Sequence, residues 1–198
     1  MNKKYLIKLT TAAVLAALVT VMNFTPFVGY IPFAGLSITT LHIPVILGAV
    51  LLGPVYGAVL GAVWGIDCLI YALLQGTPDA IIFTNPLISV VPRILVGLVA
   101  GLLAVLLARK IKKGFLVSLI STFVGTVTNT VLVLTAIWLF GSSGLAKLSA
   151  LLTNIISVAV SVNGIVELAA ALVIVTAVAK ALEGSGIYRR FIHDSAQS

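Results

Sequence analysis

Residues 9–24, LTTAAVLAALVTVMNF, begin a run without any Lys, Arg, Asp or Glu that ends only at Asp67. One membrane-crossing helix needs about 20 apolar residues, so this run is long enough for more than one crossing. Across the 198 residues, 61% are hydrophobic and 9% are charged, whereas a soluble domain has about 25% charged residues. The composition excludes a water-soluble, disordered, fibrous or disulfide-stapled protein and predicts an integral membrane protein.

Proline and glycine residues divide the chain into six predicted helices, at residues 5–24, 42–52, 55–75, 87–108, 115–140 and 154–182. The first helix follows Lys3 and Lys4 as the core of a signal peptide does. Its apolar stretch is too long for a signal peptide, so we expect a retained helix. The expected fold is all-α, a single six-helix membrane domain over residues 1–198.

The positions of the basic residues predict the orientation of these helices. Lys and Arg cluster at the N-terminus, at residues 109–113 and in the C-terminal part of the chain, and such clusters favour the cytoplasmic side. Four predicted helices then lie between the first two clusters and two between the last two. We expect both termini to be cytoplasmic in the cell membrane, with loops 25–41, 76–86 and 141–153 on the outer face. These long outer loops are expected to cover a ligand pocket, or else simply to cover the bundle.

Four polar residues stand out within the predicted spans, where an ionised side chain costs roughly 2.5–3.5 kcal/mol on insertion scales. Arg93 lies about two turns into the fourth helix. Asn129 shares a face of the fifth helix with Thr122 and Thr126, and Glu167 lies midway along the sixth helix, one turn after Asn163. Polar residues inside a membrane usually face a cavity or a partner.

This set of side chains indicates a site for a small anion that carries several other polar groups. Arg binds carboxylates through two parallel hydrogen bonds, and Asn and Glu bond hydroxyl and amide groups. The candidate ligand-binding residues are Arg93, Asn129, Asn163, Glu167, Phe83, Thr126 and His42. The alternative is an Arg93–Glu167 ion pair, with the two Asn side chains as interhelical hydrogen-bonding groups. Asp67 is expected to cap its helix or to pair with Lys147.

Small residues recur at helical spacing in three of the predicted helices. Gly57, Gly61 and Gly65 share one face of the third helix, and Gly97 and Gly101 share one face of the fourth. Such faces let helix backbones approach closely, and internal packing accounts for both. The first helix carries two such pairs, which are candidates for docking another membrane protein: Ala12/Ala16 and Ala13/Ala17.

Several classes of enzyme chemistry have no motif in this chain. The sequence contains no phosphate-binding G-x-x-x-x-G-K-[ST] loop, no G-x-S-x-G and no H-E-x-x-H. Cys68 is the one cysteine, and His42 has no second His or Cys at the spacing of metal ligands. We therefore expect neither an enzyme nor a metal or other cofactor, and any ATP hydrolysis must come from a partner.

At this point the sequence resembles the substrate-binding S components of energy-coupling-factor (ECF) vitamin transporters. The resemblance covers nearly the whole chain and is carried by TTLHIPVILGA at 39–49, followed by LGP at 52–54 and the glycine-spaced third helix. Together with PRILVG at 92–97, these motifs look most like the pantothenate-specific members.

The resemblance implies a non-enzymatic transport subunit that binds one vitamin beneath its outer loops. It also implies partners: a transmembrane coupling protein (the T component) and two ABC-type ATPases, with an alanine pair of the first helix as the docking surface. Pantothenate carries a carboxylate, two hydroxyls and an amide, which suits the polar residues above. An S component for another vitamin and an autonomous secondary transporter remain alternatives, although no symmetric repeat supports the latter.

Overall fold

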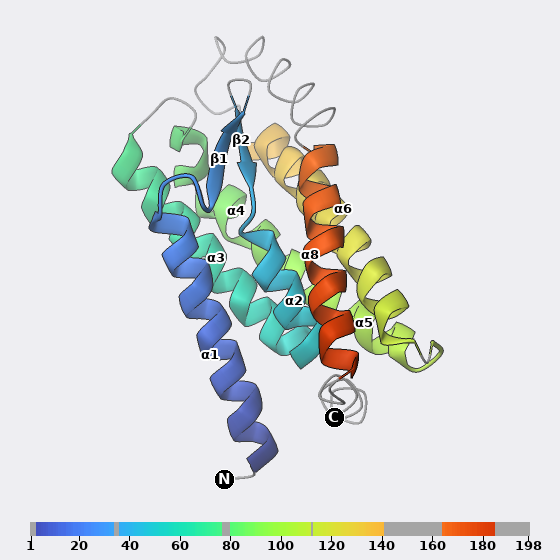
Figure 1. Cartoon of the computed structure of the whole chain (residues 1–198). Coiled ribbons are helices and arrows are strands. Elements are labelled where there is room, and N and C mark those ends of the chain that lie inside the picture. Colours follow the sequence, from blue (N-terminus) through green and yellow to red (C-terminus); the bar gives the residue numbers. More distant parts are fainter. Residues whose placement is uncertain (1–2, 34–35, 77–79, 112, 141–163, 185–198) are drawn as a thin grey trace.

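The computed structural model describes residues 3–33, 36–76, 80–111, 113–140 and 164–184. In chain order these form α1 (Lys3–Phe24), β1 (Tyr30–Phe33), β2 (Leu36–Thr39), α2 (His42–Leu52), α3 (Pro54–Gln75), the 3-10 helix η1 (Ala80–Thr84), α4 (Pro86–Ser89), α5 (Val91–Ala108), α6 (Gly114–Phe140) and α8 (Gly164–Gly184). Figure 1 shows the long helices running roughly alongside one another, with the β1–β2 hairpin at one end of the bundle.

Five of the described helices are long and apolar enough to cross a membrane: Tyr5–Phe24, Pro54–Gln75, Pro86–Ala108, Gly114–Phe140 and Gly164–Glu183. The chain is a membrane protein, and large apolar side chains such as Val55, Leu74 and Trp138 are exposed on its outside. The remaining predicted helix, at residues 42–52, forms α2, which has 11 residues, or about 16 Å at 1.5 Å per residue. It therefore spans about half of a hydrocarbon core that is ~30 Å thick.

The predicted loop 25–41 contains an antiparallel two-stranded hairpin, which adds two four-residue strands to the helical bundle that the sequence predicts. Tyr30 pairs with Thr39 and Phe33 with Leu36. Aromatic and β-branched residues favour extended backbone here, and strand pairing satisfies N–H and C=O groups that would otherwise be unpaired. The Thr40 amide also donates to the Gly29 carbonyl, which extends the pairing by one bond at the base of the hairpin.

The predicted fourth helix is interrupted, which changes the position of Arg93. The chain forms the short helix α4 and then begins α5 at Val91, with Pro92 in the first turn of α5. Proline favours a first helical turn because it has no N–H to bond and its φ suits the helix. Arg93 therefore lies in the first turn of α5 and not two turns into a helix.

The glycine faces pack α3 against α5, as the sequence predicts. A Cβ at Gly65 would lie 2.6 Å from the Val90 Cα, and one at Gly101 would lie 2.6 Å from the Pro54 Cα. Gly57 and Gly97 oppose each other between these two levels. Only glycine permits backbones to approach this closely, so the α3–α5 pair forms the fixed frame to which Arg93 belongs.

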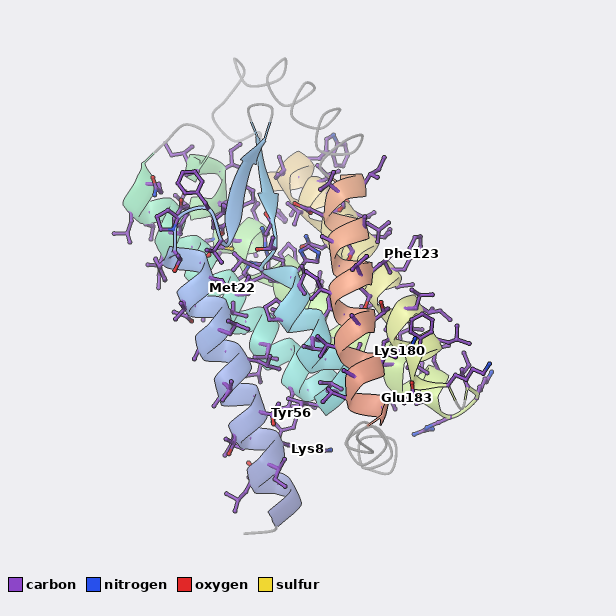
Figure 2. The ribbon with its side chains drawn as sticks, in the orientation of Figure 1. Lys8, Met22, Tyr56, Phe123, Lys180 and Glu183 are labelled. Carbon is purple, nitrogen blue, oxygen red and sulfur yellow. The ribbon has the colours of Figure 1, made fainter. Side chains whose placement is uncertain are left out.

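Apart from Arg93, the basic residues that the structure describes lie toward the end of the bundle opposite the hairpin. Figure 2 shows Lys8 of α1 and Lys180 and Glu183 of α8 toward that end. The Glu183 carboxylate accepts a hydrogen bond of 2.9 Å from the Gly114 amide, so the end of α8 lies against the start of α6. The hairpin and the basic groups thus define two chemically different ends.

Candidate functional site

Arg93 is a buried cation held between two aromatic rings. Its side chain is 7% exposed, and its Cζ lies 5.3 Å from the ring centroid of Trp64 and 5.4 Å from that of Phe83. Cation–π attraction of this kind is strengthened when water is excluded. The structure therefore brings the predicted residues Arg93 and Phe83 together, on α5 and η1.

Within the described part of the chain, the Arg93 guanidinium has no hydrogen bond to an anionic group. Nη1 donates to the Ile88 carbonyl at 2.6 Å, and Nε is buried without a hydrogen-bond partner. Electrostatic attraction reaches Arg93 from Glu167, but no ion pair joins these two described residues. A buried charge normally requires a hydrogen-bonded counter-charge, so this guanidinium is suited to an external anion.

Glu167 has a structural partner on the hairpin. Its Oε1 accepts a hydrogen bond of 2.6 Å from the Thr39 amide, which joins the end of β2 to α8. The sequence predicts Glu167 midway along a helix over 154–182, but it lies in the first turn of α8 as described. Asn163, predicted to share its face, lies outside the described residues. The contact with Thr39 fixes one side of the hairpin.

Asn129 and Thr126 belong to the polar face of α6 that packs into the bundle. Thr126 is 2% and Asn129 is 8% exposed. A Cβ at Gly125 would lie 3.1 Å from Ile46 Cδ1 of α2 and 3.2 Å from the Ala100 Cβ of α5, so this face meets both helices. Buried oxygens on the face have no hydrogen-bond partner among the described residues, namely those of Ser121, Thr122, Thr126 and Asn129 Oδ1.

His42 lies at the same level as Asn129. Gly125 of α6 lies against Ile46 of α2. His42 lies one helical turn from Ile46 toward the hairpin, and Asn129 lies one turn from Gly125 in the same direction. His42 is fully buried beside the backbone of Thr39 and Glu167, although neither ring nitrogen meets those groups in hydrogen-bond geometry. Unpaired donors and acceptors of His42 and Asn129 therefore occupy the hairpin half of the bundle, the half in which Arg93 lies.

Tyr30 attaches the other side of the hairpin to α1 and α3. Its hydroxyl donates to Asn23 Oδ1 at 2.9 Å and lies 3.2 Å from the Cys68 Sγ. The Tyr30 ring stacks on Tyr71 with centroids 5.0 Å apart. Burial raises the pKa of the Tyr30 phenol well above 10.0, so the hydroxyl stays protonated at neutral pH and remains a donor. The hairpin is thus held from both sides.

Asp67 joins the same junction between α1 and α3. Thr20 Oγ1 donates to Asp67 Oδ2 at 2.8 Å, and Asn23 Nδ2 donates to the Asp67 carbonyl at 3.1 Å. Lys147, the expected partner of Asp67, lies outside the described residues. Sequence reasoning did not predict this junction or a role for Trp64, which is fully buried with its indole nitrogen unpartnered. The position of Trp64 three residues after Gly61, in a glycine-spaced helix, was the available signal.

The two alanine pairs of α1 face different surroundings. Ala12 is 7% exposed and, with the partly buried Ala16, packs against the core residues of neighbouring helices. Ala13 and Ala17 are exposed. The geometry leaves only the Ala13/Ala17 pair accessible on the described surface of α1.

The polar groups described here suit ligand binding. Among the described residues, no group of three His, Cys, Asp or Glu side chains lies where it could hold a metal ion. Arg93 contributes a guanidinium between the Trp64 and Phe83 rings, and the interior of the bundle adds the imidazole, amide and hydroxyl groups without partners among the described residues. This set can bind an organic anion with hydroxyl or amide groups.

Comparison with known proteins agrees with this description. Residues 7–179 match the family described as ECF transporter, substrate-specific component. The Pantothenic acid transporter PanT of Lactococcus lactis subsp. cremoris (strain MG1363) is 36% identical over 86% of this chain and 90% of its own length. The Pantothenate transporter PanT of Leuconostoc mesenteroides subsp. mesenteroides is 31% identical over 77% of this chain and 89% of its own. The chain belongs to the family of substrate-specific components of ECF transporters.

Proposed function

We propose that this protein is the pantothenate-binding subunit of an ECF-type ABC importer. The observation that carries the proposal is the buried Arg93 guanidinium, which has no ion-pair partner among the described residues. A carboxylate ligand would supply that partner. Two relatives with pantothenate in their names, similar over most of the chain, support pantothenate as the anion.

The polar groups of pantothenate suit the candidate binding residues. Its carboxylate would bind Arg93, with Phe83 as an apolar wall. Its hydroxyls and amide would bond Thr126, Asn129 and His42, whose buried polar atoms have no partner among the described residues. We keep Asn163 and Glu167 in the proposed site. Glu167 would act there through the hairpin that it bonds.

The proposed orientation follows from the two ends of the bundle. The basic end would face the cytoplasm, and the hairpin would face outward and cover the bound vitamin. The chain would cross the membrane six times, with the short α2 as one of the crossings. Both termini would then be cytoplasmic.

The proposed partners are a transmembrane T component and two ABC-type ATPases that supply the energy. A neighbouring helix can approach closely where alanines repeat at i and i+4. Of the two predicted pairs, Ala13/Ala17 would dock the T component, because Ala12/Ala16 already packs within this chain.

Calorimetry with purified protein tests the ligand. Pantothenate is titrated into the wild-type chain, with thiamin, riboflavin and biotin as comparison vitamins. We expect saturable heat with pantothenate alone. Binding of a different vitamin, with no heat from pantothenate, would overturn the assignment. ATP-dependent uptake into vesicles that contain the coupling module then tests the partners. Equal uptake by this chain without that module would instead favour an autonomous secondary transporter.

A further inference from the structure

Trp64 carries a buried hydrogen-bond donor that the fold does not use. Its side chain is fully buried, and the indole Nε1 has no partner in the described parts of the chain. A buried donor without an acceptor loses its hydrogen bond to water without replacement, which destabilises the folded protein. Such a group in a native structure calls for an explanation.

Trp64 and Arg93 are neighbours because glycines flank Trp64 on α3. Gly61 and Gly65 lie one turn before it and one residue after it, and each contacts the α4–α5 backbone around Arg93 and Val90. This close approach places the Arg93 Cζ 5.3 Å from the centroid of the Trp64 ring. The Nε of Arg93 is also buried and unpartnered. Two unused N–H donors thus belong to side chains in direct contact.

We propose that Trp64 is a ligand-binding residue whose indole N–H donates to the same anionic group that Arg93 binds. A carboxylate has two oxygens and several lone pairs, so it can accept from a guanidinium and an indole together. The inference rests on the proposed function and refines it. The site is suited to a planar anion that accepts several hydrogen bonds, and a neutral hydroxyl in its place would offer one uncharged oxygen and weaker hydrogen bonds to both donors.

The indole also distinguishes this site from a simple cation pocket. An Arg alone attracts any anion, whereas a second donor at a fixed position favours a group with two acceptor atoms. Trp64 has few rotatable bonds and is enclosed by its neighbours, so its N–H is already oriented before the ligand binds. Pre-orientation lowers the entropy that binding must overcome.

A comparison of two ligands and two variants tests this proposal. Trp64→Phe keeps an aromatic ring against Arg93 but removes the N–H. The matched control is Trp138→Phe, since Trp138 is the second of the two tryptophans and is 73% exposed on α6. Each protein is titrated with pantothenate and with the alcohol in which CH2OH replaces the carboxylate.

We expect Trp64→Phe to weaken pantothenate binding by about tenfold to a hundredfold, and to weaken binding of the alcohol clearly less. Trp138→Phe should leave both affinities unchanged. Equal losses for the two ligands, or no loss for either, would overturn the role of Trp64 while the wild-type affinity for pantothenate still supports the proposed function. Failure of the wild-type protein to bind pantothenate would instead overturn the proposed function.

An observation on the Trp138→Phe protein avoids any dependence on the stability of the Trp64 variant. This protein has one indole N–H, that of Trp64, and its ¹⁵N–¹H resonance can be followed in detergent micelles. Pantothenate should move the proton resonance downfield, as a new hydrogen bond to a carboxylate requires, and the alcohol should move it less. A resonance unaffected by saturating pantothenate would contradict the proposal.

Discussion

Gly61→Ala tests whether the close contact of α3 and α5 positions Arg93. A Cβ at residue 61 would lie 2.7 Å from the Arg93 carbonyl carbon and 3.0 Å from the Ile94 Cα. Ordinary contacts of a Cβ begin at 3.4 Å. The two backbones must therefore separate by at least about 0.7 Å, and overpacking of this kind typically costs 1–3 kcal/mol. Backbone atoms cannot rotate away as a side chain can, so we expect Gly61→Ala to lower the free energy of unfolding by an amount within this range.

The displaced backbone is that of Arg93 itself, so we expect Gly61→Ala to weaken ligand binding as well as to lower stability. A loss of 1.4 kcal/mol in binding is tenfold in Kd, and we expect at least that. The control is Gly125→Ala, where a Cβ would meet the side chains of Ile46 and Ala100 at 3.1–3.3 Å, and the terminal methyl of Ile46 can move. Thermal unfolding in detergent and calorimetry with pantothenate measure both effects. If Gly61→Ala matched Gly125→Ala in melting temperature and affinity, the glycine contact would not position Arg93.

Three further predictions follow from the same contacts. Arg93→Ala should lower affinity for an anionic vitamin about thirtyfold to a thousandfold, and Arg93→Lys should restore only part of it because an ammonium cannot form the paired bonds; unchanged calorimetric affinity would refute this. Ala13→Leu or Ala17→Leu should abolish ATP-dependent uptake in vesicles and preserve vitamin binding, whereas Ala12→Leu should lower the melting temperature. Normal uptake by the Ala13→Leu and Ala17→Leu proteins, with a lowered melting temperature, would exclude Ala13/Ala17 as the docking pair. Glu167→Ala should speed hydrogen exchange at the Thr39 amide while Glu167→Gln, which keeps an acceptor, should not; equal exchange in both variants would show that this bond does not hold the hairpin.

The sequence was sufficient to identify the five long apolar helices that the structure describes and the glycine faces by which α3 and α5 pack. Length, apolar composition and small-residue spacing are properties of a continuous segment, so they can be read without knowing the neighbours. The ends of α2 and α3 were predicted to within a residue because Gly53 and Pro54 separate them; Gly53 has a φ of 99°, which favours glycine. The hairpin at Tyr30–Thr39 was missed because its residues were interpreted as loop punctuated by proline and glycine.

Sequence reasoning selected Arg93 as a candidate ligand-binding cation because a charge in a span has few explanations, and the structure shows that this residue is buried. It did not select Trp64 or the Asn23–Tyr30 junction. A tryptophan or asparagine in a membrane segment is ordinary until its surroundings show whether its polar atom has a partner. The surroundings of Trp64 and of Asn23 depend on which elements lie beside α3 and α1. The sequence of a single segment does not contain that information.

The choice between the alanine pairs of α1 shows where the sequence stops determining the structure. In a soluble helix, polar residues mark the exposed face and apolar residues mark the buried one. In a membrane helix the lipid and the protein interior are both apolar, so residues 9–24 look alike on every side. The sequence therefore determined that α1 is long and apolar enough to span a membrane and carries small-residue faces. Only packing against α2 and α3 decided that Ala12 is buried and Ala13 is exposed.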